Sequence, residues 1–198
     1  MRNVAENARL SRLGFVLLAL ASGACTKPQS ASPQEPALVQ TSTIKEIMDS
    51  MVEPSADFLF DSVAQIADEH GVTYKAPQTD DEWQEVRRRA VLLLEAPNLV
   101  TMHGRKVAPP NDKSQNPQIE LEPAQIQALI DGDRSHFVER ASTLQEAASL
   151  ALKAIDAKDK DALFQACDRI DKACENCHLV YWYPNDQRAQ EAFRKSNK

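Results

Sequence analysis

The sequence predicts an all-α fold, an antiparallel four-helix bundle with a long loop between its second and third helices. Apolar residues recur every three or four positions in four segments of residues 41–198, a spacing typical of helices with one buried face. Only 5 glycines occur in 198 residues, and no alternating strand pattern recurs. Residues 41–198 have the length of one domain, and the short turn at 156–158 makes the last two helices antiparallel.

The first helix is expected to begin at the capping box Thr43-Ile44-Lys45-Glu46 and to end near His70-Gly71. Pro54 should kink or split it, because proline lacks an amide donor and crowds the preceding turn. The second helix begins at the capping box Thr79-Asp80-Asp81-Glu82, and Pro97 is expected to end it. The apolar face of the first helix comprises Ile44, Met48, Met51, Leu59, Val63 and Ile66.

Residues 98–120 are rich in proline and asparagine and are expected to form a loop, followed by a short helix from Glu122 to Asp131. The fourth helix should begin at the N-cap Asp159. Both remaining helices carry a clear apolar stripe. In the third it is Phe137, Ala141, Leu144, Ala148, Ala151 and Ile155, and in the fourth it is Leu163, Cys167, Ile170, Cys174 and Cys177.

The end of the last stripe carries the motif with the clearest chemistry, Cys174-Glu175-Asn176-Cys177-His178. C-x-x-C-H is the spacing of a covalent haem-attachment site. On a helix the two thiols and the imidazole share one face, so they can hold one porphyrin and ligate its iron. Zinc sites and dithiol redox pairs also use C-x-x-C. The sequence offers neither a matching second pair of zinc ligands nor a βαβ context, so we predict one haem c, covalently attached.

The N-terminal residues predict export from the cytoplasm. Residues 1–24 have the basic head, short apolar run and small final residues of a secretory signal peptide, and the apolar run is too short to span a membrane. Cys25 follows Ala21-Ser22-Gly23-Ala24, which resembles a bacterial lipobox except that Ser22 stands where leucine is usual. Lipidation of Cys25 and ordinary cleavage before it are both open. Residues 25–40 form a Pro/Ser/Gln-rich flexible linker, so the protein is expected to be periplasmic, either free or lipid-anchored.

The chain is acidic. Its net charge is −6, and removal of residues 1–24, which carry +2, leaves −8. This balance argues against a nucleic-acid partner and is compatible with docking to another redox protein. The only membrane association we expect is through the lipid at Cys25.

A haem motif placed near the C-terminus, behind three helical segments, resembles that of the class II c-type cytochromes, which are cytochrome c′ and its low-spin relatives. The resemblance covers about residues 41–185 and includes the run Tyr181-Trp182-Tyr183-Pro184, expected to pack against the haem edge. It implies that Cys174 and Cys177 hold the haem and that His178 is the proximal iron ligand.

The resemblance also bears on the sixth ligand, which in low-spin members is a methionine from early in the first helix. We favour Met48, because it lies one turn past the helix start, as the family ligand does. Met51 is the second candidate, and Met102 and His103 in the loop are more distant ones.

The function implied is that of a single-electron carrier between redox proteins, which is not a catalyst on its own. One alternative is a five-coordinate haem protein that binds a small gas such as nitric oxide. Another is a haem subunit of a larger redox complex, with the long loop as a contact surface. Many members of the family form homodimers, so a homodimer is an assembly that the resemblance allows.

Overall fold

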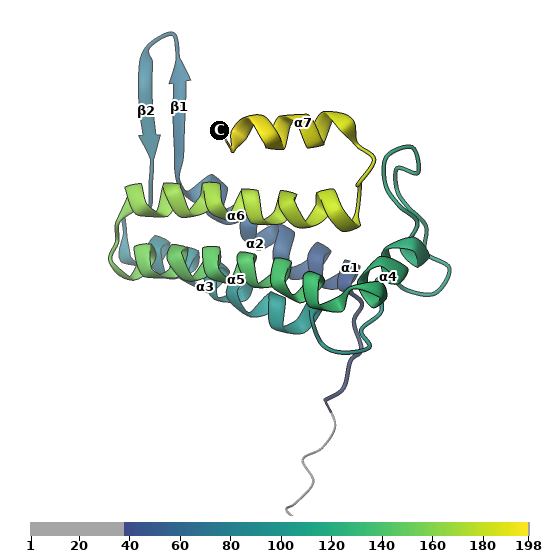
Figure 1. The fold of residues 1–198 in the computed structure, drawn as a ribbon. Coiled ribbons are helices and arrows are strands. Elements are labelled where there is room, and N and C mark those ends of the chain that lie inside the picture. Colours follow the sequence, from purple (N-terminus) through teal and green to yellow (C-terminus); the bar gives the residue numbers. More distant parts are fainter. Residues whose placement is uncertain (1–37, 198) are drawn as a thin grey trace, which may run out of the picture. The chain divides into compact units, whose positions relative to one another are not determined.

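The computed structural model describes residues 38–197, which are mostly helical with a small two-stranded sheet (Figure 1). The predicted signal peptide, Cys25 and nearly all of the predicted linker fall outside the described residues. Within residues 38–197, no helix is both long enough and apolar enough to cross a membrane.

The first helical segment changes its pitch ahead of Pro54. It comprises α1 (Ile44–Ile47), the π-helix η1 (Met48–Val52) and α2 (Glu53–Ser62). The predicted capping box is present at its start, with Thr43 and Glu46 bonded reciprocally. Because Pro54 has no N–H to donate, the chain widens in the preceding turn, where the Glu53 amide donates to the Met48 carbonyl. The helix is thus distorted ahead of Pro54, but as a π turn within a continuous helical segment and not as the expected break.

The predicted continuation of this helix to His70-Gly71 is wrong. Strands β1 (Ala64–Asp68) and β2 (Gly71–Lys75) form an antiparallel hairpin instead (Figure 1). The segment Val72-Thr73-Tyr74 has strong β propensity, and Gly71 adopts φ 125°, a conformation that glycine reaches readily. As a result Ile66, which we expected on a buried helical face, lies on a strand and is 48% exposed.

The second predicted helix is present as α3 (Asp80–Val100), with its capping box at Thr79 and Glu82. The expectation that Pro97 ends it is wrong, because the helix continues to Val100. A proline one turn from the C-terminus removes only one hydrogen bond, and the Thr101 amide and hydroxyl both donate to the Pro97 carbonyl to close the last turn.

A long loop follows α3, as predicted, and its first part is fixed to α1. The amides of Ile44 and Lys45 donate to the carbonyls of Lys106 and Val107 at 2.8 and 2.9 Å. The buried guanidinium of Arg105 also donates to main-chain carbonyls at the end of α3 and just before α1. The loop ends at α4 (Pro123–Gly132), the short helix that the sequence predicts.

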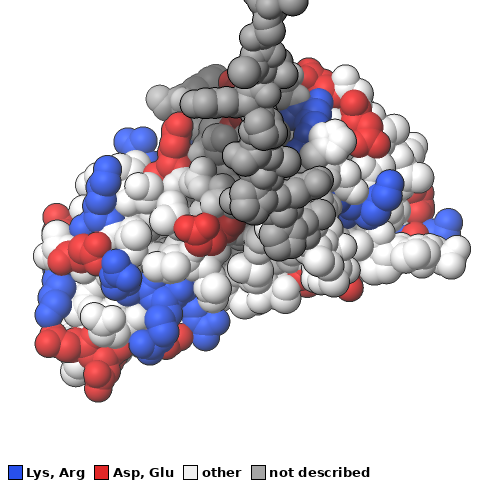
Figure 2. Space-filling model, turned by 90° about the horizontal axis from the view of Figure 1, so that it is seen from below, with Lys and Arg blue, Asp and Glu red and all other residues white. Residues whose placement is uncertain are grey.

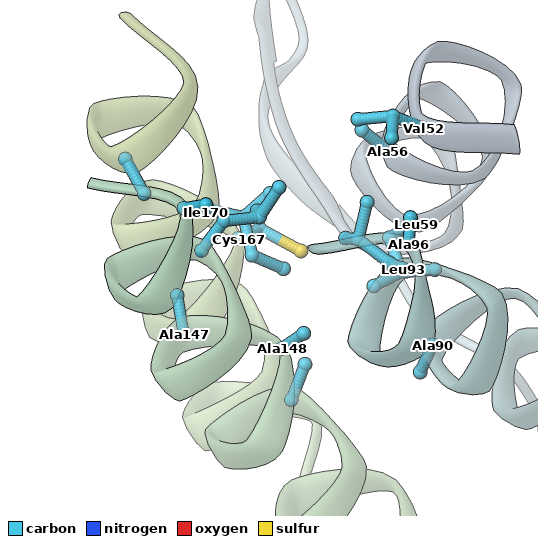
Figure 3. Packing of buried hydrophobic residues seen from close by; sticks show 14 of the residues in the cluster. Val52, Ala56, Leu59, Ala90, Leu93, Ala96, Ala147, Ala148, Cys167 and Ile170 are labelled. Carbon is cyan, nitrogen blue, oxygen red and sulfur yellow. The ribbon is translucent and has the colours of Figure 1, made fainter. Parts of the chain in front are cut away.

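The last two long helices, α5 (Arg134–Asp156) and α6 (Lys160–Tyr181), lie side by side and antiparallel (Figure 1). Helix α5 also packs against α3, while α2 contacts both α3 and α6. Every predicted core position of α5 is buried, and so are Leu163, Cys167 and Ile170 of α6. Figure 3 shows the Cys167 sulfur directed toward the side chains of α2 and α3, in agreement with its place in the predicted apolar stripe.

The chain ends in α7 (Gln187–Ser196), which the sequence analysis missed. Asp186 is its N-cap and accepts hydrogen bonds from the amides of Arg188 and Ala189. None of the residues of α7 is buried, although the helix contacts α6 (Figure 1). Its stability therefore rests mainly on the cap and on local side-chain pairs such as Lys195 with Glu191.

Charged side chains of both signs are interspersed on the face shown in Figure 2. Exposed ion pairs also occur among the described residues, such as Arg87 with Asp156 at 2.8 Å. Pairs of this kind contribute about 0–1 kcal/mol each, so the buried helix faces carry the fold.

The capping box of α3 gives a testable pH dependence. The amides of Gln78 and Thr79 donate to the Glu82 carboxylate and hold its pKa below the usual 4.5. A lowered folded-state pKa stabilises the fold above the unfolded-chain pKa, and this stabilisation is lost as the pH falls through the folded-state value. We expect Glu82→Gln to lower the free energy of unfolding in urea at neutral pH, and the difference from wild type to shrink below about pH 4.

The control for this measurement is Glu146→Gln. Glu146 is exposed on α5 and accepts no hydrogen bond from the described residues. A difference between wild type and Glu82→Gln that stays constant with pH would contradict the prediction.

Candidate functional site

The three motif residues Cys174, Cys177 and His178 lie on the last turns of α6 and line one cavity of about 400 Å³. This volume is within the range of small-molecule binding sites, about 300–1,000 Å³. The predicted stripe of α6 thus continues from the core into the wall of the cavity. Opposite elements contribute an apolar lining that includes Ile44, Val52, Ala56, Phe60, Ile126 and Phe137.

Met48 lines the same cavity from η1. The other three candidates for the distal ligand are Met51, Met102 and His103. All three are among the described residues, and none of them lines the cavity. Met51 packs against the core, and the Met102 sulfur accepts a hydrogen bond from Arg105 at 3.0 Å. Of the four side chains considered, the fold therefore brings Met48 alone to the cavity that holds the motif.

Burial makes the two motif thiols weak acids. It raises the pKa of Cys174 to about 12 and that of Cys177 to about 11, so both are neutral thiols near neutral pH. Dithiol redox enzymes need the opposite shift, because their nucleophile is the thiolate. Burial also lowers the pKa of His178, with the nearby Glu175 charge opposing this, and favours the neutral imidazole that ligates metals.

The residues after the motif fold back over His178. The amides of Trp182 and Tyr183 both donate to the His178 carbonyl, at 2.8 and 3.0 Å. The Tyr183 hydroxyl donates to the Glu175 carboxylate at 2.7 Å, and the Tyr183 ring lies 5.7 Å from the imidazole, centroid to centroid. Tyr181 instead packs edge-on against Phe137 of α5. The rings of Trp182 and Tyr183 thus lie beside the side chain of His178.

Arg140 of α5 supports the motif from the neighbouring helix, and the sequence analysis missed it. Its guanidinium donates to the Asn176 carbonyl at 2.9 Å and to the His136 ring at 3.0 Å. The sequence holds a weak signal, since Arg140 directly precedes the buried Ala141 and so borders the apolar stripe. The contact fixes the middle of the motif to α5.

An acidic row borders the cavity on the side of η1 and α2. Asp49, Glu53 and Asp57 follow one another at intervals of four and all line the cavity. Lys45 also lines it, and its ammonium group forms an ion pair with Asp112 in the loop at 2.7 Å. The hydrogen bond to Asp112 raises the pKa of Lys45, while burial opposes the shift.

Among residues 38–197, no group of three or more histidine, cysteine, aspartate or glutamate side chains is arranged to hold a metal ion by itself. No protein-family model, curated protein or solved structure matches the chain.

Proposed function

We propose that the protein is a periplasmic c-type cytochrome that carries single electrons between redox proteins and is not an enzyme on its own. One haem c is attached through Cys174 and Cys177, with His178 as proximal ligand and Met48 as distal ligand. The observation that carries this proposal is the single cavity lined by all four side chains. A bound haem supplies a one-electron iron couple, which a methionine ligand shifts toward the ferrous state.

The residues of the cavity fit a haem in their chemistry. Both thiols are protonated, and addition of a thiol to a vinyl group needs no oxidant, because sulfur bonds to one vinyl carbon and the hydrogen goes to the other. Apolar and aromatic side chains make up most of the remaining wall. His178 and Met48 supply a nitrogen and a sulfur, the donor pair found in electron-carrying cytochromes. The protein's own contribution is to position and tune the group.

The proposed architecture is the antiparallel four-helix bundle of the class II c-type cytochromes. In it, α1, η1 and α2 together form the first helix, and α3, α5 and α6 form the others. The contacts of α5 with α3 and α6, and of α2 with α3 and α6, support this arrangement because they connect the four in a ring. The hairpin β1–β2, α4 and α7 are additions to it.

The proposed partners are other redox proteins. The acidic row of Asp49, Glu53 and Asp57 favours a partner with a basic surface, since complementary charge speeds encounter and orients the complex. Export, and an anchor at Cys25, rest on the sequence patterns of residues 1–40.

The second candidate is a five-coordinate haem protein that binds a small gas. It is favoured by one observation, that Met48 is the single methionine or histidine candidate facing the cavity opposite the motif. If Met48 does not ligate the iron, an apolar distal space is left that suits a small uncharged gas.

The proposal is tested by purifying the protein from a host that attaches haem c and measuring its mass under denaturing conditions. We expect the mass of the polypeptide plus one haem, together with the spectrum of a c-type haemochrome. A mass equal to that of the polypeptide alone would contradict haem attachment. With haem attached, a low-spin oxidised spectrum supports the electron carrier, and a high-spin spectrum supports the gas-binding protein instead.

A further inference from the structure

The hydrogen bond between Tyr183 and Glu175 closes a short loop of chain around His178. We use the name proximal strap for the Tyr183 hydroxyl, the Glu175 carboxylate and the 2.7 Å hydrogen bond between them. Two main-chain bonds from Trp182 and Tyr183 to the His178 carbonyl hold the strap at its base. Three hydrogen bonds thus constrain the chain immediately next to the proposed iron ligand.

The position of Glu175 makes the strap relevant to the imidazole. Glu175 is three residues before His178 on α6, so the two side chains are neighbours on the helix surface. Both side chains are partly buried, and the Tyr183 ring lies 5.7 Å from the imidazole, so screening by water is reduced. The charge of a carboxylate at such a site acts on the electron donation of a ligating histidine to a metal, and the Tyr183 ring that this carboxylate holds lies beside the imidazole.

We propose that Tyr183 is a positioning residue for His178 and acts through Glu175. The strap fixes the imidazole plane and moderates the negative charge of the Glu175 carboxylate beside it. Closing the end of α6 requires only the two main-chain hydrogen bonds to the His178 carbonyl. The hydrogen bond between the Tyr183 and Glu175 side chains is not needed for it. This inference rests on the proposed function, in which His178 ligates a haem iron.

The first variant is Tyr183→Phe, which keeps the ring and both main-chain bonds and removes only the hydroxyl. In the haem-loaded protein, we expect a changed g-value anisotropy in electron paramagnetic resonance, because the imidazole orientation is released. We also expect a lower reduction potential, because a carboxylate without its donor carries more negative charge near the iron and favours the ferric state.

Substitutions of Glu175 separate the effect of the imidazole orientation from the effect of the carboxylate charge. In Glu175→Gln the amide oxygen still accepts from Tyr183 but the charge is gone, so we expect wild-type anisotropy and a raised potential. Glu175→Ala removes both the hydrogen-bond acceptor and the charge. The g-value anisotropy should therefore change as in Tyr183→Phe, while the reduction potential rises. Tyr74→Phe is the control, because Tyr74 lies on strand β2, is 67% exposed and does not line the cavity.

Each outcome decides the inference. The opposite potential shifts of Tyr183→Phe and Glu175→Gln, with altered anisotropy in the first alone, support it. Loss of thermal stability in Tyr183→Phe with wild-type potential and anisotropy would overturn it and leave a purely structural role. Equal effects of Tyr183→Phe and Tyr74→Phe would overturn it as well. The denaturing mass of each preparation is measured first, so that absence of haem is recognised as a failure of the proposed function.

Discussion

The double variant Cys174→Ala/Cys177→Ala is expected to lose covalent haem entirely, so that its denaturing mass equals that of the polypeptide. The thiols are the proposed attachment points, and both line the cavity from one face of α6. Each single variant should retain one thioether and yield a smaller loaded fraction. Mass spectrometry of the intact protein, with haem absorbance per polypeptide, measures both effects.

Cys167→Ala is the matched control for this experiment. Cys167 lies on the same helix and the same stripe, two turns before Cys174, but it belongs to the core and not to the cavity (Figure 3). Its burial raises its pKa to about 12, so it stays a neutral thiol like the other two. We expect this variant to carry one haem. Covalent haem on the double variant, or none on Cys167→Ala, would contradict the assignment of the two motif thiols.

The second large effect is expected for Met48→Ala, which should convert the oxidised protein from a low-spin to a high-spin form. Removing the thioether leaves the iron with His178 as its one protein ligand, and a weaker field favours the high-spin state. The reduction potential should fall at the same time, because the methionine that favours ferrous iron is gone. Optical and paramagnetic resonance spectra, with a redox titration, measure these changes.

Met51→Ala is the appropriate comparison, because Met51 lies in the same π-helix and packs against the core without lining the cavity. We expect it to lose some stability through the cavity it creates in the core and to keep the low-spin spectrum. A low-spin spectrum unchanged in Met48→Ala would remove Met48 as ligand. A spectrum that turned high-spin only in Met51→Ala would assign the ligand to Met51.

Local signals account for the elements that the sequence predicts correctly. The capping boxes at Thr43 and Thr79 and the N-cap at Asp159 are formed by residues three or fewer positions apart, so the sequence contains both partners of each bond. The stripe of α5 has regular spacing and proves to be buried throughout. Signals of this kind need no knowledge of the remainder of the fold.

The errors arise where two local signals compete. In residues 63–75 an apolar spacing of three extends the helix to Ile66, but β-branched residues and Gly71 favour a hairpin, and the hairpin prevails. At Pro97 the helix-breaking effect is outweighed by burial of the last turn, in which Ala96, Pro97 and Val100 are all buried. Tertiary packing decides the case of Pro97, whereas β2 is exposed along its whole length and the hairpin follows from the stronger of two local preferences.

The candidate site also contains residues that the sequence predicts and a contact that it does not. Cys174, Cys177 and His178 are adjacent in the sequence and were found from their spacing. Met48 is favoured over Met51 by its distance from the helix start, and of the two only Met48 lines the cavity. The contact of Arg140 with Asn176 joins residues 36 positions apart on two helices, so the sequence holds only a weak signal for it.

The π turn also explains a periodicity that an ordinary helix does not sustain. In an α-helix each step of four residues drifts by about 40° around the axis, so a row of such steps soon leaves its face. The wider turn of η1 offsets part of this drift, and Ile44, Met48, Val52, Ala56 and Phe60 all reach the cavity. The acidic residues Asp49, Glu53 and Asp57 have the same spacing of four, and each directly follows one of these apolar residues. The apolar wall and its charged border are therefore two neighbouring rows of residues with the same four-residue spacing. Met48 belongs to the apolar row.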